Sequence, residues 1–158
     1  MIVCIRNRQK RRAIDTRFLR TLTQAILQEI APAQSEIGIH LVNTREMTAL
    51  NQKYLGHEGS TDVITFDHQD IPNRRGQSHR PLYGELFISM DDAIQQARDH
   101  DTHWMSEVVR YVIHGVLHLL GYDDLDPSDR RIMKRAEQRI VVEIAESWDL
   151  RKLSRKKK

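Results

Sequence analysis

An almost wholly apolar segment that contains two histidines constrains the fold of this chain more than any other feature. Residues 111–124 read YVIHGVLHLLGYDD, and the apolar character begins at residue 108. A helix through 108–120 has hydrophobic side chains nearly all round, and such a helix is buried in the centre of a domain rather than laid on its surface. We therefore predict that this helix forms the core against which the other elements pack.

The two histidines of this helix form a candidate metal site. His114 and His118 are four residues apart, so a helix places them on one face with Cβ atoms roughly 5–6 Å apart. Gly121 can end the helix in a left-handed conformation, after which the chain turns back and brings Asp123 or Asp124 to the histidines as a third ligand. The alternative is a pair of core-facing histidines. The shared register, the glycine stop and the two carboxylates favour a metal ion.

The spacing H-x-x-x-H-x-x-G-x-x-D matches the metzincin pattern with two departures. Gly115 stands where a metalloprotease carries the glutamate that is its general base, and Asp124 stands at the third histidine. The missing glutamate disfavours a zinc peptidase. Two histidines and a carboxylate also form the ligand set of non-haem iron oxygenases, but a pair from one helix fits those enzymes poorly.

The rest of the chain predicts a single α+β domain, a small mixed β-sheet covered by helices with the metal-binding helix buried at its centre. Cys4 is expected to be packed, and Asp91 or Asp92 is expected to cap the third helix. Strands are predicted near residues 1–5, 37–41, 62–66 and 83–89, an exposed loop at 67–81, and helices near 15–30, 44–54, 92–97, 102–120 and 127–144.

The charge distribution indicates a polyanionic partner. The formal net charge is +3, and much of the excess lies in residues 6–12 and 151–158. We expect a domain at 1–150 and a basic disordered tail at 151–158, although a solvated tail without a partner has the same composition. The hydrophobic runs are too short to cross a bilayer, no signal pattern opens the chain, and a single cysteine excludes an internal disulfide. These features predict a cytoplasmic protein without a membrane partner.

Three blocks of the sequence resemble the YbeY family, the zinc-dependent endoribonucleases of ribosomal RNA maturation. The blocks are LN at 50–51 to Tyr54 with TDVITF at 61–66, GELFIS at 84–89 and HGVLHLLGYD at 114–123. The resemblance implies a zincin-like site at the base of a cleft, with one Zn²⁺ held by His114, His118 and Asp124. It also implies action on 16S ribosomal RNA ends and in ribosome quality control, with ribosomal RNA and ribosome-associated proteins as partners.

Four positions depart from the family pattern. Asp124 takes the place of the third histidine ligand, and Leu55 takes the place of an arginine expected to face the RNA phosphate. Thr65 replaces a serine and keeps the hydroxyl, while Glu85 replaces an aspartate and keeps the carboxylate. The first two changes bear on catalytic rate.

An aspartate ligand leaves the site able to hold zinc and changes its charge by one unit. The carboxylate partly neutralises the ion, which weakens its Lewis acidity and makes its bound water less acidic. It also makes the site more favourable to iron or manganese than three imidazoles would. We expect zinc to be the resident metal, polarising a phosphate oxygen or delivering hydroxide.

The motif contains no evident general base, so the catalytic candidates rest on expected proximity. They are Asp62, Thr65, Glu85 and His57. Asp62 has a simpler role as a turn or cap residue, Glu85 as a solvated strand residue, and His57 as an exposed loop residue. Thr61 and Thr65 are expected to line the cleft.

Basic residues elsewhere can offset the loss of a cation at Leu55. Candidates are the tail and four arginines, Arg45, Arg74, Arg75 and Arg80. Such contacts bind phosphates without reading sequence, so specificity would come from shape, single-stranded ends or the ribosome. The competing function is a ribosome-associated or RNA-binding protein that keeps a structural metal site and has little or no nuclease activity.

Overall fold

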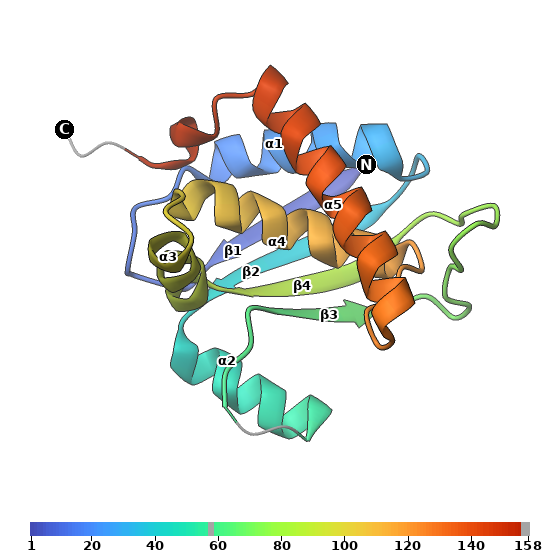
Figure 1. Ribbon diagram of the computed structural model, residues 1–158, viewed down its shortest axis with the longest axis horizontal. Helices are drawn as coiled ribbons and strands as arrows, with labels where there is room; N and C mark the ends of the chain where they lie inside the picture. Colours follow the sequence, from blue (N-terminus) through green and yellow to red (C-terminus); the bar gives the residue numbers. More distant parts are fainter. Residues whose placement is uncertain (57–58, 156–158) are drawn as a thin grey trace.

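The computed structural model describes residues 1–56 and 59–155, and in this part of the chain a mixed four-stranded sheet lies between helices (Figure 1). The strand order is β1-β2-β4-β3, with β1, β2 and β4 parallel and β3 antiparallel to β4 at one edge. The predicted α+β class and the order of elements are confirmed. The strands are β1 (Ile2–Asn7), β2 (Glu36–Val42), β3 (Val63–Asp67) and β4 (Tyr83–Ser89).

Helices cover the two faces of the sheet unequally. Helices α1, α4 and α5 lie on one face, α2 and η1 lie on the other, and α3 packs beside α4 (Figure 1). Within the described ranges, no helix is long and apolar enough to cross a membrane. The bounds are α1 (Thr16–Ile30), α2 (Thr44–Leu50), the π-helical turn η1 (Asn51–Leu55), α3 (Met90–Asp99), α4 (Trp104–Leu119), α5 (Pro127–Ser147) and the 3₁₀ turn η2 (Leu150–Leu153).

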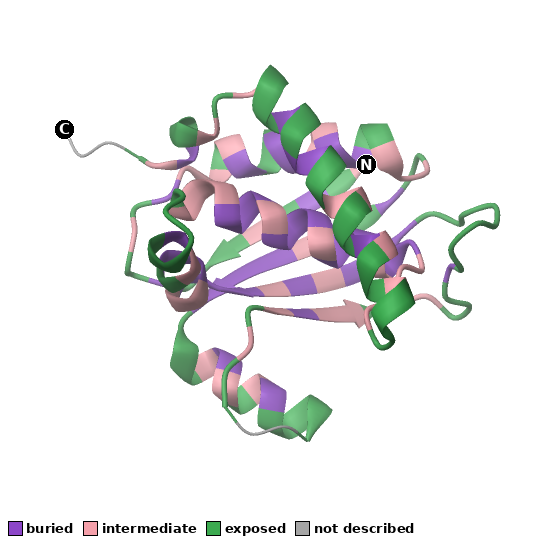
Figure 2. Cartoon of the chain, in the orientation of Figure 1, coloured by how far each residue is buried: buried purple, intermediate pink, exposed green. Residues whose placement is uncertain are grey.

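Helix α4 is the buried central element that its composition predicts. Figure 2 shows it buried along most of its length, whereas α5 exposes its outer side. Strand residues alternate between the two faces of the sheet, and Leu86 and Ile88 of β4 point toward α4. A Cβ at Gly115 would lie 2.5 Å from Cδ2 of Leu86, so α4 packs directly on β4 at this position. A larger residue at 115 would therefore require Leu86 to move.

Two local expectations are wrong. Helix α3 begins at Met90, because Ser89 is the N-cap and its Oγ accepts a hydrogen bond from the backbone N–H of Asp92 at 3.2 Å. Asp91 and Asp92 thus lie in the first turn, two and three residues after the cap. Cys4 is exposed rather than packed, because it points to the face of β1 opposite the buried Val3.

The expectation of a disordered tail is wrong for the beginning of that segment. Residues 150–153 form η2, and Leu153 is 0% exposed in the main core. The backbone of η2 is joined to the start of α1, since the N–H of Asp15 donates to the carbonyl of Leu153 at 2.9 Å. The apolar side chain of Leu153 therefore anchors the start of the basic C-terminal segment to the core. Residues 156–158 lie outside the described part of the chain.

The C-terminal end of α4 is fixed by Gly121, which has φ of 100°. The N–H of Gly121 donates to the carbonyl of His118 and that of Tyr122 to the carbonyl of Leu117, each at 3.0 Å. This pair of bonds is a Schellman motif, which requires a left-handed residue at this position. The predicted glycine stop is confirmed, and it reverses the chain toward the histidines.

The loop between β3 and β4 packs against this turn. A Cβ at Gly121 would lie 2.6 Å from the backbone nitrogen of Arg75. Asn73 is buried, accepts from the N–H of Arg80 at 2.7 Å and donates Nδ2–H to the carbonyl of Leu119 at 3.3 Å. The basic loop is thereby held at the end of α4.

Replacing Gly121 with alanine should cost more stability than the same change at Gly76. Both glycines have left-handed φ, 100° and 81°, so both substitutions carry a conformational penalty of about 1–2 kcal/mol. A Cβ at Gly76 meets no atom within 4 Å, whereas one at Gly121 meets loop backbone. Chemical denaturation should show Gly121→Ala losing at least about 1 kcal/mol more. Equal losses would show that the loop does not pack against the turn.

Candidate metal centre

Three side chains converge where α4 ends. Nε2 of His114 and Nε2 of His118 are 3.2 Å apart, and Oδ2 of Asp124 lies 3.7 Å from the first and 3.6 Å from the second. Two ligands of a tetrahedral ion, each about 2.0–2.2 Å from it, lie roughly 3.3–3.6 Å apart. Among the described residues, no other group of three histidine, cysteine or acidic side chains has metal-ligand spacing. The three predicted ligands therefore fit a single metal ion.

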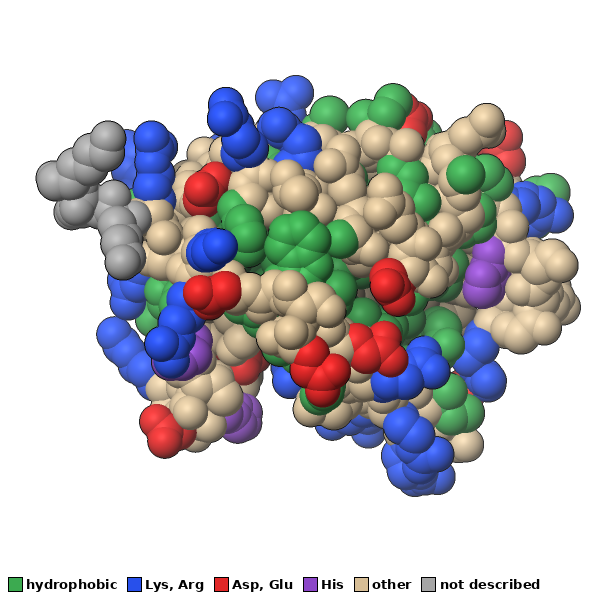
Figure 3. Space-filling view, turned by 90° about the horizontal axis from the view of Figure 1, so that it is seen from above, with side chains coloured by type: hydrophobic (Ala, Val, Ile, Leu, Met, Phe, Trp, Pro, Cys, Tyr) green, Lys and Arg blue, Asp and Glu red, His purple; other side chains and the backbone are tan. Residues whose placement is uncertain are grey.

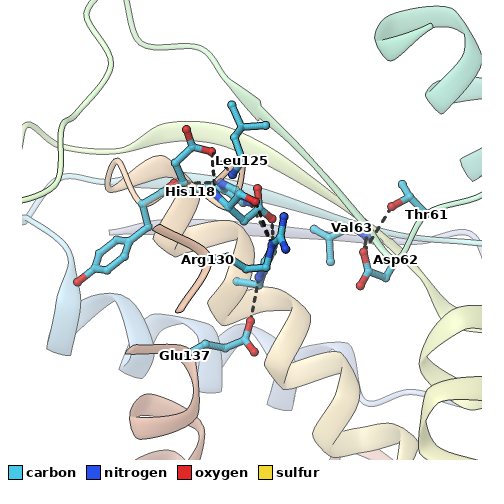
Figure 4. Close-up of polar contacts among 11 residues, drawn as sticks. Thr61, Asp62, Val63, His118, Leu125, Arg130 and Glu137 are labelled. Carbon is cyan, nitrogen blue, oxygen red and sulfur yellow. Dashed lines mark hydrogen bonds and ion pairs between the residues drawn. The ribbon is translucent and has the colours of Figure 1, made fainter. Parts of the chain in front are cut away.

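Hydrogen bonds orient both imidazole rings toward this point, and His118 and Glu137 are labelled in Figure 4. Nδ1 of His114 lies 2.8 Å from Oε1 of Glu137, and Nδ1 of His118 lies 3.1 Å from the carbonyl of Tyr122. Both partners are acceptors, which assigns the proton of each neutral ring to Nδ1. The lone pair of each Nε2 is then free for a metal ion, the arrangement in which metal-binding histidines are usually held.

Glu137 of α5 orients His114, and the sequence analysis did not predict this role. Its side chain is 12% exposed, and while Oε1 accepts from His114, Oε2 accepts from Nη1 of Arg110 at 3.1 Å. The helical period indicates that Glu137 lies on the inner face of α5, because it is four residues from both Met133 and Val141, which are buried. A carboxylate on the buried face of a helix needs a partner.

The turn after α4 selects Asp124 over Asp123. Oδ1 of Asp123 accepts from the backbone N–H groups of Asp124 at 2.7 Å and Leu125 at 3.2 Å, so this carboxylate caps the turn. The Asp124 carboxylate points to the histidines, and its backbone carbonyl accepts from Nε of Arg130 at 3.3 Å. The third ligand is thus fixed through its main chain.

The two histidines differ in their affinity for protons. Burial and the nearby positive charge of His114 lower the pKa of His118. Burial also acts to lower the pKa of His114, but the hydrogen bond and charge of Glu137, with smaller contributions from Asp62 and Asp124, raise it overall. A metal ion therefore competes with a proton chiefly at His114.

Comparison with known proteins places this site in a family. The family model described as endoribonuclease YbeY matches residues 4–145, which include all three ligands. The chain belongs to the YbeY family of endoribonucleases.

Two relatives and one solved structure illustrate the similarity to the YbeY family. The endoribonuclease YbeY of Anaeromyxobacter sp. (strain Fw109-5) is 37% identical over 141 residues, covering 89% of this chain and 71% of the relative. That of Finegoldia magna is 34% identical over 148 residues, covering 91% and 94%. The solution structure of TM1509 from Thermotoga maritima matches with a TM-score of 0.64 at 25% identity, covering 94% of this chain and 92% of that one.

Asp62 and Thr65, two catalytic candidates of the YbeY-like site, lie on or beside β3. Oδ1 of Asp62 accepts from the N–H of Val63 at 2.8 Å, so its simpler role as a turn residue is confirmed. Its charge still contributes to raising the pKa of His114, which places it near the metal helix. Thr65 shares a strand face with Val63, which packs against the core under α4. Thr61, whose Oγ1 lies 3.5 Å from Oδ1 of Asp62, belongs to the same turn.

The expected proximity of Glu85 to the metal is wrong. Glu85 lies on the face of β4 opposite Leu86, where it accepts from Nε2 of His40 at 2.8 Å and Nε2 of His68 at 2.9 Å. The hydrogen bonds from His68 and His40 lower the pKa of its carboxyl. Adjacent strand residues point to opposite faces, so a sequence block alone does not give the face. His57 lies outside the described residues.

The predicted basic residues are distributed around the candidate metal centre rather than gathered in one patch. Arg74 and Arg75 lie beside Gly121, in the turn that follows α4, and Arg80 follows in the same loop. Arg45 lies on α2, on the other face of the sheet. Leu55 is 48% exposed at the end of η1, so the missing arginine leaves an apolar surface residue. On the face shown in Figure 3, lysine and arginine side chains alternate with acidic ones.

Glu137→Gln should weaken zinc binding about 10–100-fold, the effect expected for the loss of a carboxylate that orients a histidine ligand. The amide keeps the shape but removes the charge paired with His114 and Arg110. Glu143→Gln, on an exposed position of the same helix, is the matched control. Competition with a chelator of known affinity measures both. Equal zinc affinity in the two variants would contradict the role of Glu137.

Proposed function

We propose that the chain is a zinc-dependent endoribonuclease that cleaves single-stranded RNA by metal-assisted phosphodiester hydrolysis. The observation that carries this proposal is the His114, His118 and Asp124 triangle, with interatomic distances of 3.2–3.7 Å. Membership of the YbeY family supports the endoribonuclease activity. Zinc suits a set of two imidazoles and one carboxylate, which leaves a fourth position for water or substrate.

Each residue of the centre has a distinct task in this proposal. His114 and His118 present Nε2, and Asp124 adds a negative charge that moderates the ion. When bound, the metal supplies Lewis acidity toward a phosphate oxygen or a water molecule. Glu137 cannot serve as a free base, because both its oxygens accept hydrogen bonds. Asp62 is the candidate proton acceptor, because its charge contributes to raising the pKa of His114 and its side chain is exposed directly before β3.

The packing of α4 argues against a peptide as the substrate. A zinc peptidase of this pattern needs a glutamate directly after the first histidine. Gly115 occupies that position, and a Cβ there would lie 2.5 Å from Cδ2 of Leu86, so even a methyl group would collide with this side chain. The peptidase role is thus disfavoured by geometry as well as by composition.

We further propose that the substrate is ribosomal RNA, in maturation of 16S ribosomal RNA ends and ribosome quality control in the cytoplasm, with ribosome-associated proteins as partners. The basic loop that holds Arg74 and Arg75 beside the metal turn supports an RNA substrate. Contacts from such arginines are to phosphates and carry no sequence information. Asp124 and Leu55 favour the second candidate, an RNA-binding protein whose metal is structural.

Substitution at the ligands distinguishes the two candidates. His114→Ala should reduce RNA cleavage at least about a hundredfold, since metal-bound water or polarised phosphate is lost. Asp124→Asn should lower both zinc content and cleavage, whereas Asp123→Asn keeps the acceptor oxygen of the turn and should change neither. Asp124→His should remain active. Metal analysis and a cleavage assay measure these effects. A His114→Ala variant that cleaves RNA like the native chain would contradict the proposed metal-dependent activity.

RNA binding by the native chain should weaken steeply with salt. Each phosphate contact on a single strand contributes about −0.7 to the slope of log K against log salt. Fluorescence anisotropy with a labelled single-stranded RNA at about 50–300 mM salt measures the slope of log K against log salt. An affinity that stays constant over this range would argue against phosphate contacts by the basic residues.

A further inference from the structure

Three arginines contact the elements that build the metal centre, and they differ in how their charge is used. Nη1 of Arg110 pairs with Glu137 at 3.1 Å, and Nη2 of Arg75 lies 3.7 Å from Asp129. The side chain of Arg130 makes one hydrogen bond to a described residue, from Nε to the carbonyl of Asp124 at 3.3 Å. Within residues 1–56 and 59–155, no carboxylate oxygen lies within 4.0 Å of its guanidinium nitrogens. Its positive charge is therefore not neutralised by an ion pair there.

The surroundings of Arg130 make that charge important. Asp124 reduces the net charge of a bound divalent ion by one unit, while the charge of Glu137 is already paired with Arg110. Asp123 and Asp126 lie in the same turn as exposed carboxylates. A phosphodiester that approaches the ion thus meets several negative charges at short range. A cation beside the ion would offset them.

The geometry of Arg130 suits that role. The residue is exposed on α5, and its Nε donates a hydrogen bond to the backbone carbonyl of Asp124, which holds the guanidinium beside this candidate ligand. In the view of Figure 4, its side chain is drawn between His118 and the Asp62 turn. The two Nη groups have no bond to a described residue. A guanidinium held in this way offers a planar fork of donors that matches two phosphate oxygens.

We propose that Arg130 contacts the phosphate of the substrate beside the metal ion and stabilises the charge that develops on its non-bridging oxygens. This inference rests on the proposed function. It assigns to α5 a substrate-contacting residue as well as the carboxylate that orients His114. The alternative is that Arg130 acts only by holding the Asp124 carbonyl, in which case its loss would act through the metal.

Arg130→Gln tests the proposal, with Arg130→Lys as a charge-preserving variant and Arg131→Gln as the control, since Arg131 is exposed on the same helix. Arg130→Gln should lower kcat for single-stranded RNA about a hundredfold, as for loss of one donor to developing negative charge. Zinc affinity should stay within about twofold, and the salt slope of log kcat/KM should fall by about 0.7. Arg130→Lys should recover part of the rate, and Arg131→Gln should match the native chain.

Binding of uridine 3′-monophosphate to the zinc-loaded protein tests Arg130 without relying on cleavage. Arg130→Gln should weaken this binding about tenfold or more, and Arg131→Gln should not. If the native chain does not cleave RNA, the proposed function fails while this measurement still decides the contact. The Arg130 proposal is overturned if Arg130→Gln binds the nucleotide like the native protein, or if it loses zinc in proportion to its loss of activity.

Discussion

The contact between Gly115 of α4 and Leu86 of β4 packs the central helix directly on the sheet, and both histidines of the candidate metal centre lie on this helix. Helix α4 is buried for most of its length, so polar chemistry is possible where its last turn reaches the surface. His114 and His118 lie in the last two turns, with partly exposed side chains. Gly121 then reverses the chain within one residue, which brings Asp124 to the same point. Burial and chain reversal together determine the ligand set.

Helix α5 completes the centre from the other side. Glu137 orients His114, and Arg130 holds the main chain of Asp124. These two residues are seven apart, two helical turns, and therefore lie on one face of α5. The same helix packs its apolar stripe against the core. One amphipathic helix thus supplies packing, the orientation of a ligand and a cation near the ligand set.

The sequence predicted the elements whose signals are local, and it did not predict relations between distant segments. The histidine pair and Gly121 follow from helical period and backbone conformation, so the ligand turn was predictable. The burial of Glu137 follows from the helical period, but its partner His114 is 23 residues away and has no local signal. Glu85 was misplaced because the face of a central strand depends on register with its neighbours. Leu153 was missed because one apolar residue in a basic run gives no periodic signal.

The coordination of the metal in a crystal structure of the zinc-loaded protein tests the central claim most directly. The geometry predicts one ion bound by Nε2 of His114, Nε2 of His118 and a carboxylate oxygen of Asp124, each about 2.0–2.2 Å away, with a water or substrate oxygen in the fourth position. An ion bound through Asp123, through either Nδ1, or with a fourth protein ligand closing the site would contradict it.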